Sequence, residues 1–185
     1  MEDIIISGVG SITEGEYNNI KLSGSCTVKG KVKANDIKVS GTANFEHDLE
    51  ASVLKIAGLA KFDGNIKCKK IYISGSCIVT GNLLADIITI SGKIEISGDV
   101  SADVLLVESS HSKFKNIYGD VINIKSSKTD INEIEATNVK VFNVSAKRIS
   151  GAKVELYENS EVEEVEYSES LTLHNTCIVK KITRL

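Results

Sequence analysis

Residues 70–84, KIYISGSCIVTGNLL, carry an apolar residue at every second place, then Ser-Gly, then the same alternation again. Close variants occur at 36–50 (DIKVSGTANFEHDLE), 53–67 (VLKIAGLAKFDGNIK) and 87–101 (IITISGKIEISGDVS). Alternation with a period of two is typical of β-strands whose side chains point in turn to opposite faces. The repeat therefore predicts many short strands of one kind.

The Ser-Gly-like corners recur at a nearly constant interval. If each corner residue is position one of a coil, the corner residues are Ser7, Ser23, Ser40, Ala57, Ser74, Ser91, Glu108, Lys125, Phe142, Tyr157 and His174. The spacing is 16, then 17 seven times, then 15 and finally 17. Position seventeen, just before each corner, is apolar in every coil. A helix could not keep this register across so many glycines.

Three pairs of apolar or small residues recur in each coil, at positions four and six, ten and twelve, and fifteen and seventeen. They predict three short strands per coil, and such strands bury a face only when successive coils stack about 4.8 Å apart. We therefore expect an all-β protein, a single-stranded parallel β-helix (solenoid) of triangular section with about 17 residues per coil. Roughly 11 coils would make it roughly 50 Å long. Residues 1–185 form a single solenoid domain on this interpretation, with regular coils over 20–107 and degenerate coils over 108–185.

Glycines and cysteines have fixed places in this repeat. We expect the corner glycines to adopt positive φ, which glycine tolerates at a bend. Three of the four cysteines fall at position four and Cys68 falls at position twelve, so all four are expected to be small buried hydrophobes. They form no CxxC pair and no histidine lies at metal-ligand spacing from them, so we expect no zinc site and no cofactor. Ile73, at position seventeen, is expected to be buried.

Composition limits the classes of function. The chain has 22 basic and 25 acidic residues, which excludes a strongly basic nucleic-acid surface, and no nucleic-acid partner is expected. No apolar run approaches the roughly 18 residues that span a bilayer. The start, MEDIIISG, is acidic and too short for the apolar region of a signal peptide. We therefore expect a cytoplasmic protein.

The coil pattern x-I/V-x-I/V-S-G-x-x-x-V-x-G-x-I/V-x-A is clearest over residues 20–107, as in KLSGSCTVKGKVKANDIKVSG (21–41). It resembles the bactofilins, the polymer-forming cytoskeletal proteins of bacteria. The resemblance implies a right-handed β-helix that assembles end to end into nucleotide-free filaments and acts as a scaffold near the cell envelope. Its implied partners are further copies of the chain and other bactofilin-like or envelope-associated proteins. The strand pattern begins by Ile4 and reaches Leu185, so we expect no tail of the kind that attaches such proteins to membrane, and no membrane contact through one.

The repeat is broken over residues 108–132, ESSHSKFKNIYGDVINIKSSKTDIN. The apolar residue of the first face moves by one place, to Phe114 and Ile131. Four polar residues should then point outward: His111, Lys113, Lys128 and Asp130. They form either a polar strip that binds a partner, or the solvated surface of a bulge or register shift, and we favour the second.

A second break is acidic: residues 155–170, ELYENSEVEEVEYSES, contain seven glutamates. Calcium loops need carboxylates that converge on a tight turn with glycine, which this stretch lacks. A solvated or partner-facing acidic stripe is the favoured interpretation.

No catalytic constellation is recognisable, because His47, His111 and His174 lie in separate coils without Ser or Asp at a fixed spacing. We therefore expect a non-catalytic scaffold that self-assembles through its end coils. The residues expected to make these contacts are Ile4, Ile6 and Ile12 at the N-terminal end, and Val179, Ile182 and Leu185 at the C-terminal end. The first group lies beside acidic residues and the second beside basic ones, which favours head-to-tail contact over a two-fold contact between identical ends. The alternative is a monomeric or dimeric binding module that caps or modulates a related filament, or binds a partner on its polar face.

Overall fold

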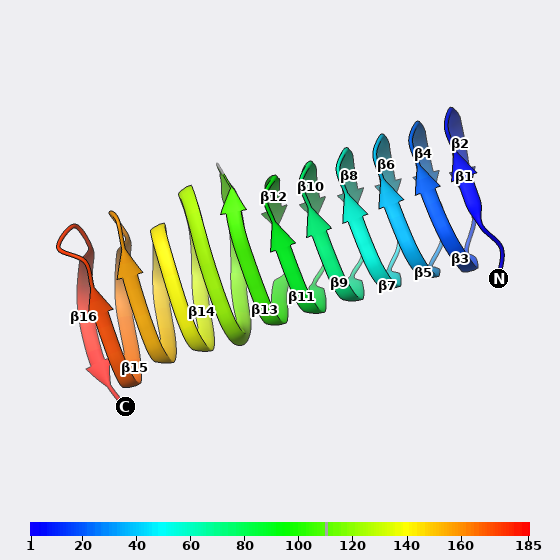
Figure 1. Cartoon of the computed structure of the whole chain (residues 1–185). Helices are drawn as coiled ribbons and strands as arrows, with labels where there is room; N and C mark the ends of the chain where they lie inside the picture. Colours follow the sequence, from blue (N-terminus) through cyan, green and yellow to red (C-terminus); the bar gives the residue numbers. More distant parts are fainter. Residues whose placement is uncertain (110) are drawn as a thin grey trace.

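The computed structural model describes residues 1–109 and 111–185, and it shows a long rod of stacked coils (Figure 1). The strands are β1 (Ile4–Ile6), β2 (Val9–Ile12), β3 (Gly15–Leu22), β4 (Ser25–Val28), β5 (Val32–Val39), β6 (Thr42–Phe45), β7 (Leu49–Ile56), β8 (Leu59–Phe62), β9 (Ile66–Ile73), β10 (Ser76–Val79), β11 (Leu83–Ile90), β12 (Lys93–Ile96), β13 (Asp99–Ser109), β14 (Ser112–Tyr157), β15 (Glu161–Leu173) and β16 (Ile178–Arg184). All belong to one sheet in which every pairing is parallel. The solenoid has about 11 turns of about 17 residues and no helix among the described residues, so the predicted fold class is confirmed.

Each regular coil contains a four-residue strand and an eight-residue strand, such as β10 and β11. Residues 17 apart pair in successive coils, as Ile73 does with Ile90 and Cys77 with Ile94. In the long strand, two consecutive residues between the two inward pairs point away from the core. The three expected faces are therefore present, but two of them form one strand that bends through a corner.

The core is a set of columns that run along the rod. Equivalent apolar side chains stack on each other from coil to coil, because parallel in-register pairing places each residue above its counterpart. Phe45 and Phe62, for example, stack with their ring centroids 4.5 Å apart. Ile73 is 2% exposed, as its position in the repeat predicts.

The corner glycines are needed for a different reason from the one expected. Among the described glycines, only Gly15 has a positive φ. A Cβ at Gly75 would instead lie 2.0 Å from the carbonyl oxygen of Gly58 in the preceding coil, and Gly41, Gly58 and Gly92 meet the same obstacle. The expectation of positive φ was wrong: glycine is required because the corners of successive coils pack backbone against backbone.

The cysteines divide into two groups. Cys26, Cys68 and Cys77 are buried, and burial raises the pKa of Cys68 and Cys77 to about 12. Cys177 is only half-buried, which corrects the expectation that all four are core residues. It lies in the last described coil, where no further coil covers it.

The irregular coils keep the solenoid intact. On the first face, Ile94 pairs with Ser112, a shift of one residue that is recovered where Asp99 pairs with Asn116. Phe114 and Ile131 are 3% and 5% exposed, so they point inward as predicted. A β-bulge lies further along, in β15 opposite Gly151 and Lys153.

A ladder of polar side chains follows one corner of the rod. The backbone N–H of Asn82 donates to Oδ1 of Asn65, and the N–H of Asp99 donates to Oδ1 of Asn82, both at 2.9 Å. At the start of the ladder, the hydrogen bond from the backbone N–H of Asn65, followed by the nearby Lys31 ammonium, lowers the pKa of the Asp48 carboxyl. The ladder satisfies corner N–H groups that no strand pairing reaches.

Candidate functional site

The N-terminal end of the rod is formed by β1 and β2, each of which pairs with a described strand on one side only. Ile4 and Ile6 are half-buried there, although their side chains pack against the core. Ile12 is 4% exposed and therefore offers little surface to a partner. The Tyr17 hydroxyl donates a hydrogen bond to the carbonyl oxygen of Thr13 at 3.1 Å, which holds the ring near the end coil.

The C-terminal end is formed by the last part of β15 and by β16, which pairs with β15 and with no other described strand. Val179 is half-buried, Ile182 is 47% exposed and Leu185 is 70% exposed. Leu173, 41% exposed, belongs to the same surface but was not among the residues expected from the sequence. The sequence pattern could have identified Leu173 as an end residue. It occupies an inward position of the last complete turn, and no later coil lies over it.

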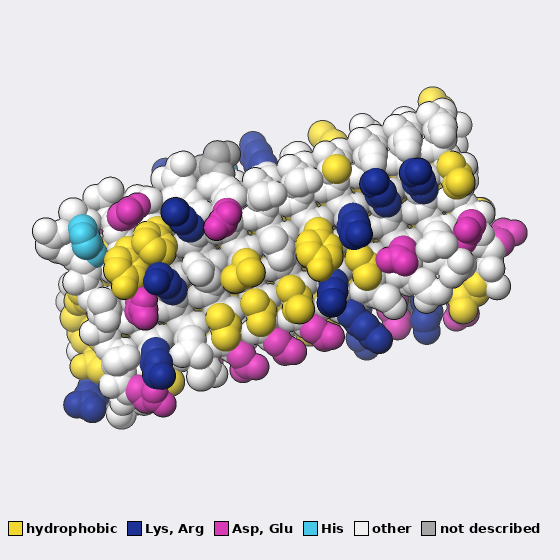
Figure 2. Space-filling view, in the orientation of Figure 1, with side chains coloured by type: hydrophobic (Ala, Val, Ile, Leu, Met, Phe, Trp, Pro, Cys, Tyr) yellow, Lys and Arg dark blue, Asp and Glu magenta, His cyan; other side chains and the backbone are white. Residues whose placement is uncertain are grey.

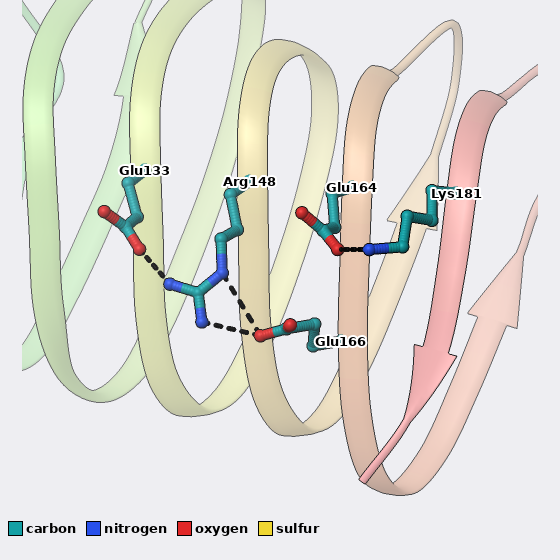
Figure 3. Close-up of polar contacts among 5 residues, drawn as sticks. All are labelled: Glu133, Arg148, Glu164, Glu166 and Lys181. Carbon is teal, nitrogen blue, oxygen red and sulfur yellow. Dashed lines mark hydrogen bonds and ion pairs between the residues drawn. The ribbon is translucent and has the colours of Figure 1, made fainter.

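Two lysines near the C-terminal end are paired with carboxylates of the coil before. Lys180 lies 3.0 Å from a carboxylate oxygen of Glu163. Lys181 pairs with Glu164 (Figure 3). These pairs reduce the basic character expected for this end. The contrast between an acidic and a basic end is therefore weaker than the sequence implies. Contact between the two ends would depend more on their apolar surface than on opposite charges.

The acidic stretch is built into the rod by ion pairs. Arg148 contacts Glu133 in the preceding coil and Glu166 in the following one, the latter at 2.6 Å (Figure 3). Five of the seven glutamates of 155–170 pair with basic side chains. The glutamates stay at least partly exposed, as expected, and the ion pairs between coils neutralise most of their charge.

The four polar residues expected on the first face do not form one continuous strip. His111, Lys113 and Lys128 are exposed and Asp130 is half-buried. Lys113 and Asp130 line a shallow groove of about 510 Å³, whose further charged lining comes from later coils: Lys147, Glu161, Glu163 and Lys180. His111 and Lys128 do not line the groove. Mixed charges and shallow walls give it no evident preference for one kind of ligand.

The described residues contain no group of three or more His, Cys, Asp or Glu placed to hold a metal ion. The nearest approach to a polar site around a histidine is His174, whose Nδ1 lies 2.9 Å from Oγ1 of Thr176 in an exposed turn. The described part of the chain also contains no helix long and apolar enough to cross a membrane. The chemistry available is that of strand edges, apolar end surfaces and paired surface charges.

Open strand edges at the ends of a regular β-solenoid agree with the one comparison that gives a match. The bactofilin family model, described as polymer-forming cytoskeletal, matches residues 2–83. Over this segment, the chain is similar to the bactofilins. The bactofilin-like segment runs from the first coil to the start of β11, so the resemblance drawn from the Ser-Gly corners is confirmed there. No curated protein and no solved structure matches the chain.

Proposed function

We propose that the protein is a non-catalytic scaffold of the cytoplasm, and that it assembles end to end through its terminal coils. One observation carries the proposal: both ends of the described rod present edge strands whose inward side chains are incompletely covered. Unpaired backbone groups around apolar side chains are a template for another strand. The bactofilin-like segment supports the proposal, because that family is described as polymer-forming.

The positions of the two edges in the coil support end-to-end stacking. Leu171 and Leu173 occupy positions fifteen and seventeen of the last complete turn, since they follow Val154 and Leu156 in register. Ile4 and Ile6 occupy the same positions at the start of the rod, where they pair with Ile20 and Leu22. A second copy could therefore place Ile4 and Ile6 on Leu171 and Leu173 and continue the core columns without a change of face.

The residues at position ten of the two ends support the same stacking. Ile182 lies at position ten, because it pairs with Val165, and Gly15 occupies position ten of the first coil. Position ten holds a branched apolar residue in the regular coils, such as Val32 and Leu49. A Cβ at Gly15 would lie 3.2–3.4 Å from the Tyr17 ring, so the exposed Ile182 side chain of the next copy would pack against that ring.

The test replaces Ile182 by arginine in the full chain. Ile182→Arg places a charge on the apolar end surface, so we expect assembly, measured by sedimentation velocity, to be lost while the β-sheet circular dichroism is kept. Ile78→Arg is the matched control, because Ile78 is 42% exposed on the side of the rod. It should assemble as the unaltered protein does. Assembly of the Ile182→Arg variant would contradict the proposal. So would an unaltered chain that stays monomeric at every concentration, which is the result expected of a capping module.

A further inference from the structure

A set of polar side chains is buried inside the rod. Figure 2 shows Lys, Arg, Asp and Glu side chains along the outer surface, whereas the buried set consists of serines and a threonine. Its members are Ser109, Ser112, Ser126, Thr129, Ser150 and Ser160. All of them follow the start of the first break in the repeat, and the buried side chains described before that break are apolar. The core of the C-terminal coils therefore differs from that of the regular coils.

Ser112 and Thr129 lie one above the other on the first face. Ser112 pairs with Ile94, so it continues the inward column that Ile94 occupies in the preceding coil. Ser109 pairs with Ser126 in the following coil. Ser112 and Thr129 each stand three places further on, so these two residues are in register as well. Both are fully buried, at 0% exposure, and they place two hydroxyl groups in a column that is apolar in the regular coils.

The same Ser-x-x-Ser/Thr unit makes different hydrogen bonds in the two coils. In the first, the hydroxyls of Ser109 and Ser112 are bonded to each other. In the second, the Ser126 hydroxyl donates to the carbonyl oxygen of Lys128 at 3.0 Å and accepts from the Lys128 N–H at 3.2 Å. Oγ1 of Thr129 has no hydrogen-bond partner among the described residues. A buried hydroxyl without a partner destabilises a fold, and native structures rarely contain one.

The stacking distance fits a bridge between these hydroxyls. Successive coils stand about 4.8 Å apart, whereas an O–H···O hydrogen bond is about 2.7–2.8 Å long, so Ser112 and Thr129 do not bond directly. A water molecule that bonds to both hydroxyls at this length separates them by about 4.5 Å, because its two bonds meet at a roughly tetrahedral angle. One water therefore spans the step from coil to coil.

The side chains around Ser112 suit one such molecule. Serine is shorter than isoleucine, so Ser112 fills less of the close-packed core than Ile94 does in the coil before. One hydroxyl of the Ser109–Ser112 pair donates to the other, which leaves the second hydroxyl with a proton to donate. With Oγ1 of Thr129, this gives two polar partners, within the range of two to four that a buried water requires.

We propose that the core holds an internal water molecule that bridges the hydroxyls of Ser112 and Thr129. The water joins two coils at the place where the first face changes register. A larger ligand is excluded, because both side chains are fully buried. The water site does not depend on end-to-end assembly, since it lies inside the rod and away from the terminal coils.

The first test compares the thermal unfolding of Thr129→Val with that of its parent, followed by circular dichroism. Both proteins carry Ile182→Arg, so that single rods unfold whether or not the unaltered chain assembles. Valine has the shape of threonine without the hydroxyl. Thr129→Val should lower the midpoint by about 2–4 °C, because the bridging water loses one of its partners. A midpoint that is unchanged or raised would overturn the proposal, since the substitution would then have removed an unpaired hydroxyl from a dry core.

Thr27→Val is the matched control, because Thr27 is half-buried on the outward side of the same face. It should leave the midpoint nearly unchanged. An equal fall in both variants would overturn the water bridge, because the loss would then come from valine on this face.

A crystal structure of the same parent observes the site directly. We expect a water oxygen about 2.8 Å from both Oγ1 of Thr129 and Oγ of Ser112, and its loss or displacement in Thr129→Val. A core in which no water lies within hydrogen-bond distance of Thr129 would overturn the proposal.

Discussion

At the scale of single residues, the environment of a side chain depends on whether a coil covers it, as well as on its position in the repeat. Cys77 and Cys177 both occupy position four, yet Cys77 is 1% exposed and Cys177 is half-buried. The difference arises because Cys77 lies between two described coils and Cys177 lies in the last one. Residues that follow the same sequence pattern can therefore differ in reactivity.

This difference predicts the order of thiol modification. In the Ile182→Arg variant at pH 8, one thiol, that of Cys177, should react rapidly with a maleimide, and all four should react after denaturation. Cys68 and Cys77 should resist because burial excludes the reagent and because a pKa of about 12 leaves the thiol neutral, whereas the thiolate is the nucleophile. Mass spectrometry of the labelled peptides identifies the site. Rapid labelling of a second cysteine in the folded protein would show that the stacking of the coils is wrong.

At the scale of the coil, the glycine corner sets how closely neighbouring coils approach. A Cβ at Gly75 would meet the carbonyl oxygen of Gly58, and the same obstacle recurs at other corners. At Gly8, in the first coil, a Cβ would meet nothing within 4 Å. The glycine of a Ser-Gly corner is therefore needed for close packing in the middle of the rod. In the first coil, the fold does not require it.

The two glycines provide a matched pair of substitutions. Gly75→Ala should lower the free energy of unfolding by about 1–3 kcal/mol, because overpacking forces the backbone of two coils apart. Gly8→Ala should change it by less than about 0.5 kcal/mol, as a substitution in open surroundings does. Urea denaturation followed by circular dichroism measures both. Equal losses of stability would mean that the corners act through backbone conformation, as the sequence first implied.

The period of 17 residues was enough to predict the stacking of coils, the inward columns and the inward positions of Phe114 and Ile131. The sequence could not show why the corners hold glycine, since positive φ and close approach select the same residue.

The sequence also did not show the ion pairs of the C-terminal coils. Arg148 reaches Glu133, 15 residues before it, and on the other side it reaches diagonally to Glu166, two residues beyond its strand partner Glu164. Of the residues expected at the ends, Ile182 and Leu185 are exposed and Ile12 is buried, whereas the exposed Leu173 was not among them, and the role of these residues in assembly stays a prediction.

At the scale of the whole molecule, the end coils present strand edges around apolar side chains that no described coil covers. The proposed function assigns growth along the rod to these two ends. A filament built in this way would carry its strands across the filament axis and its core columns along it.

Electron microscopy of the purified full chain tests end-to-end assembly most directly. About 11 coils at 4.8 Å predict filaments with an axial subunit repeat of roughly 50 Å and a continuous 4.8 Å strand spacing across the junction between copies. The repeat should disappear in Ile182→Arg and persist in Ile78→Arg. Discrete single rods at every protein concentration, or filaments whose strand spacing is interrupted at each junction, would contradict the account.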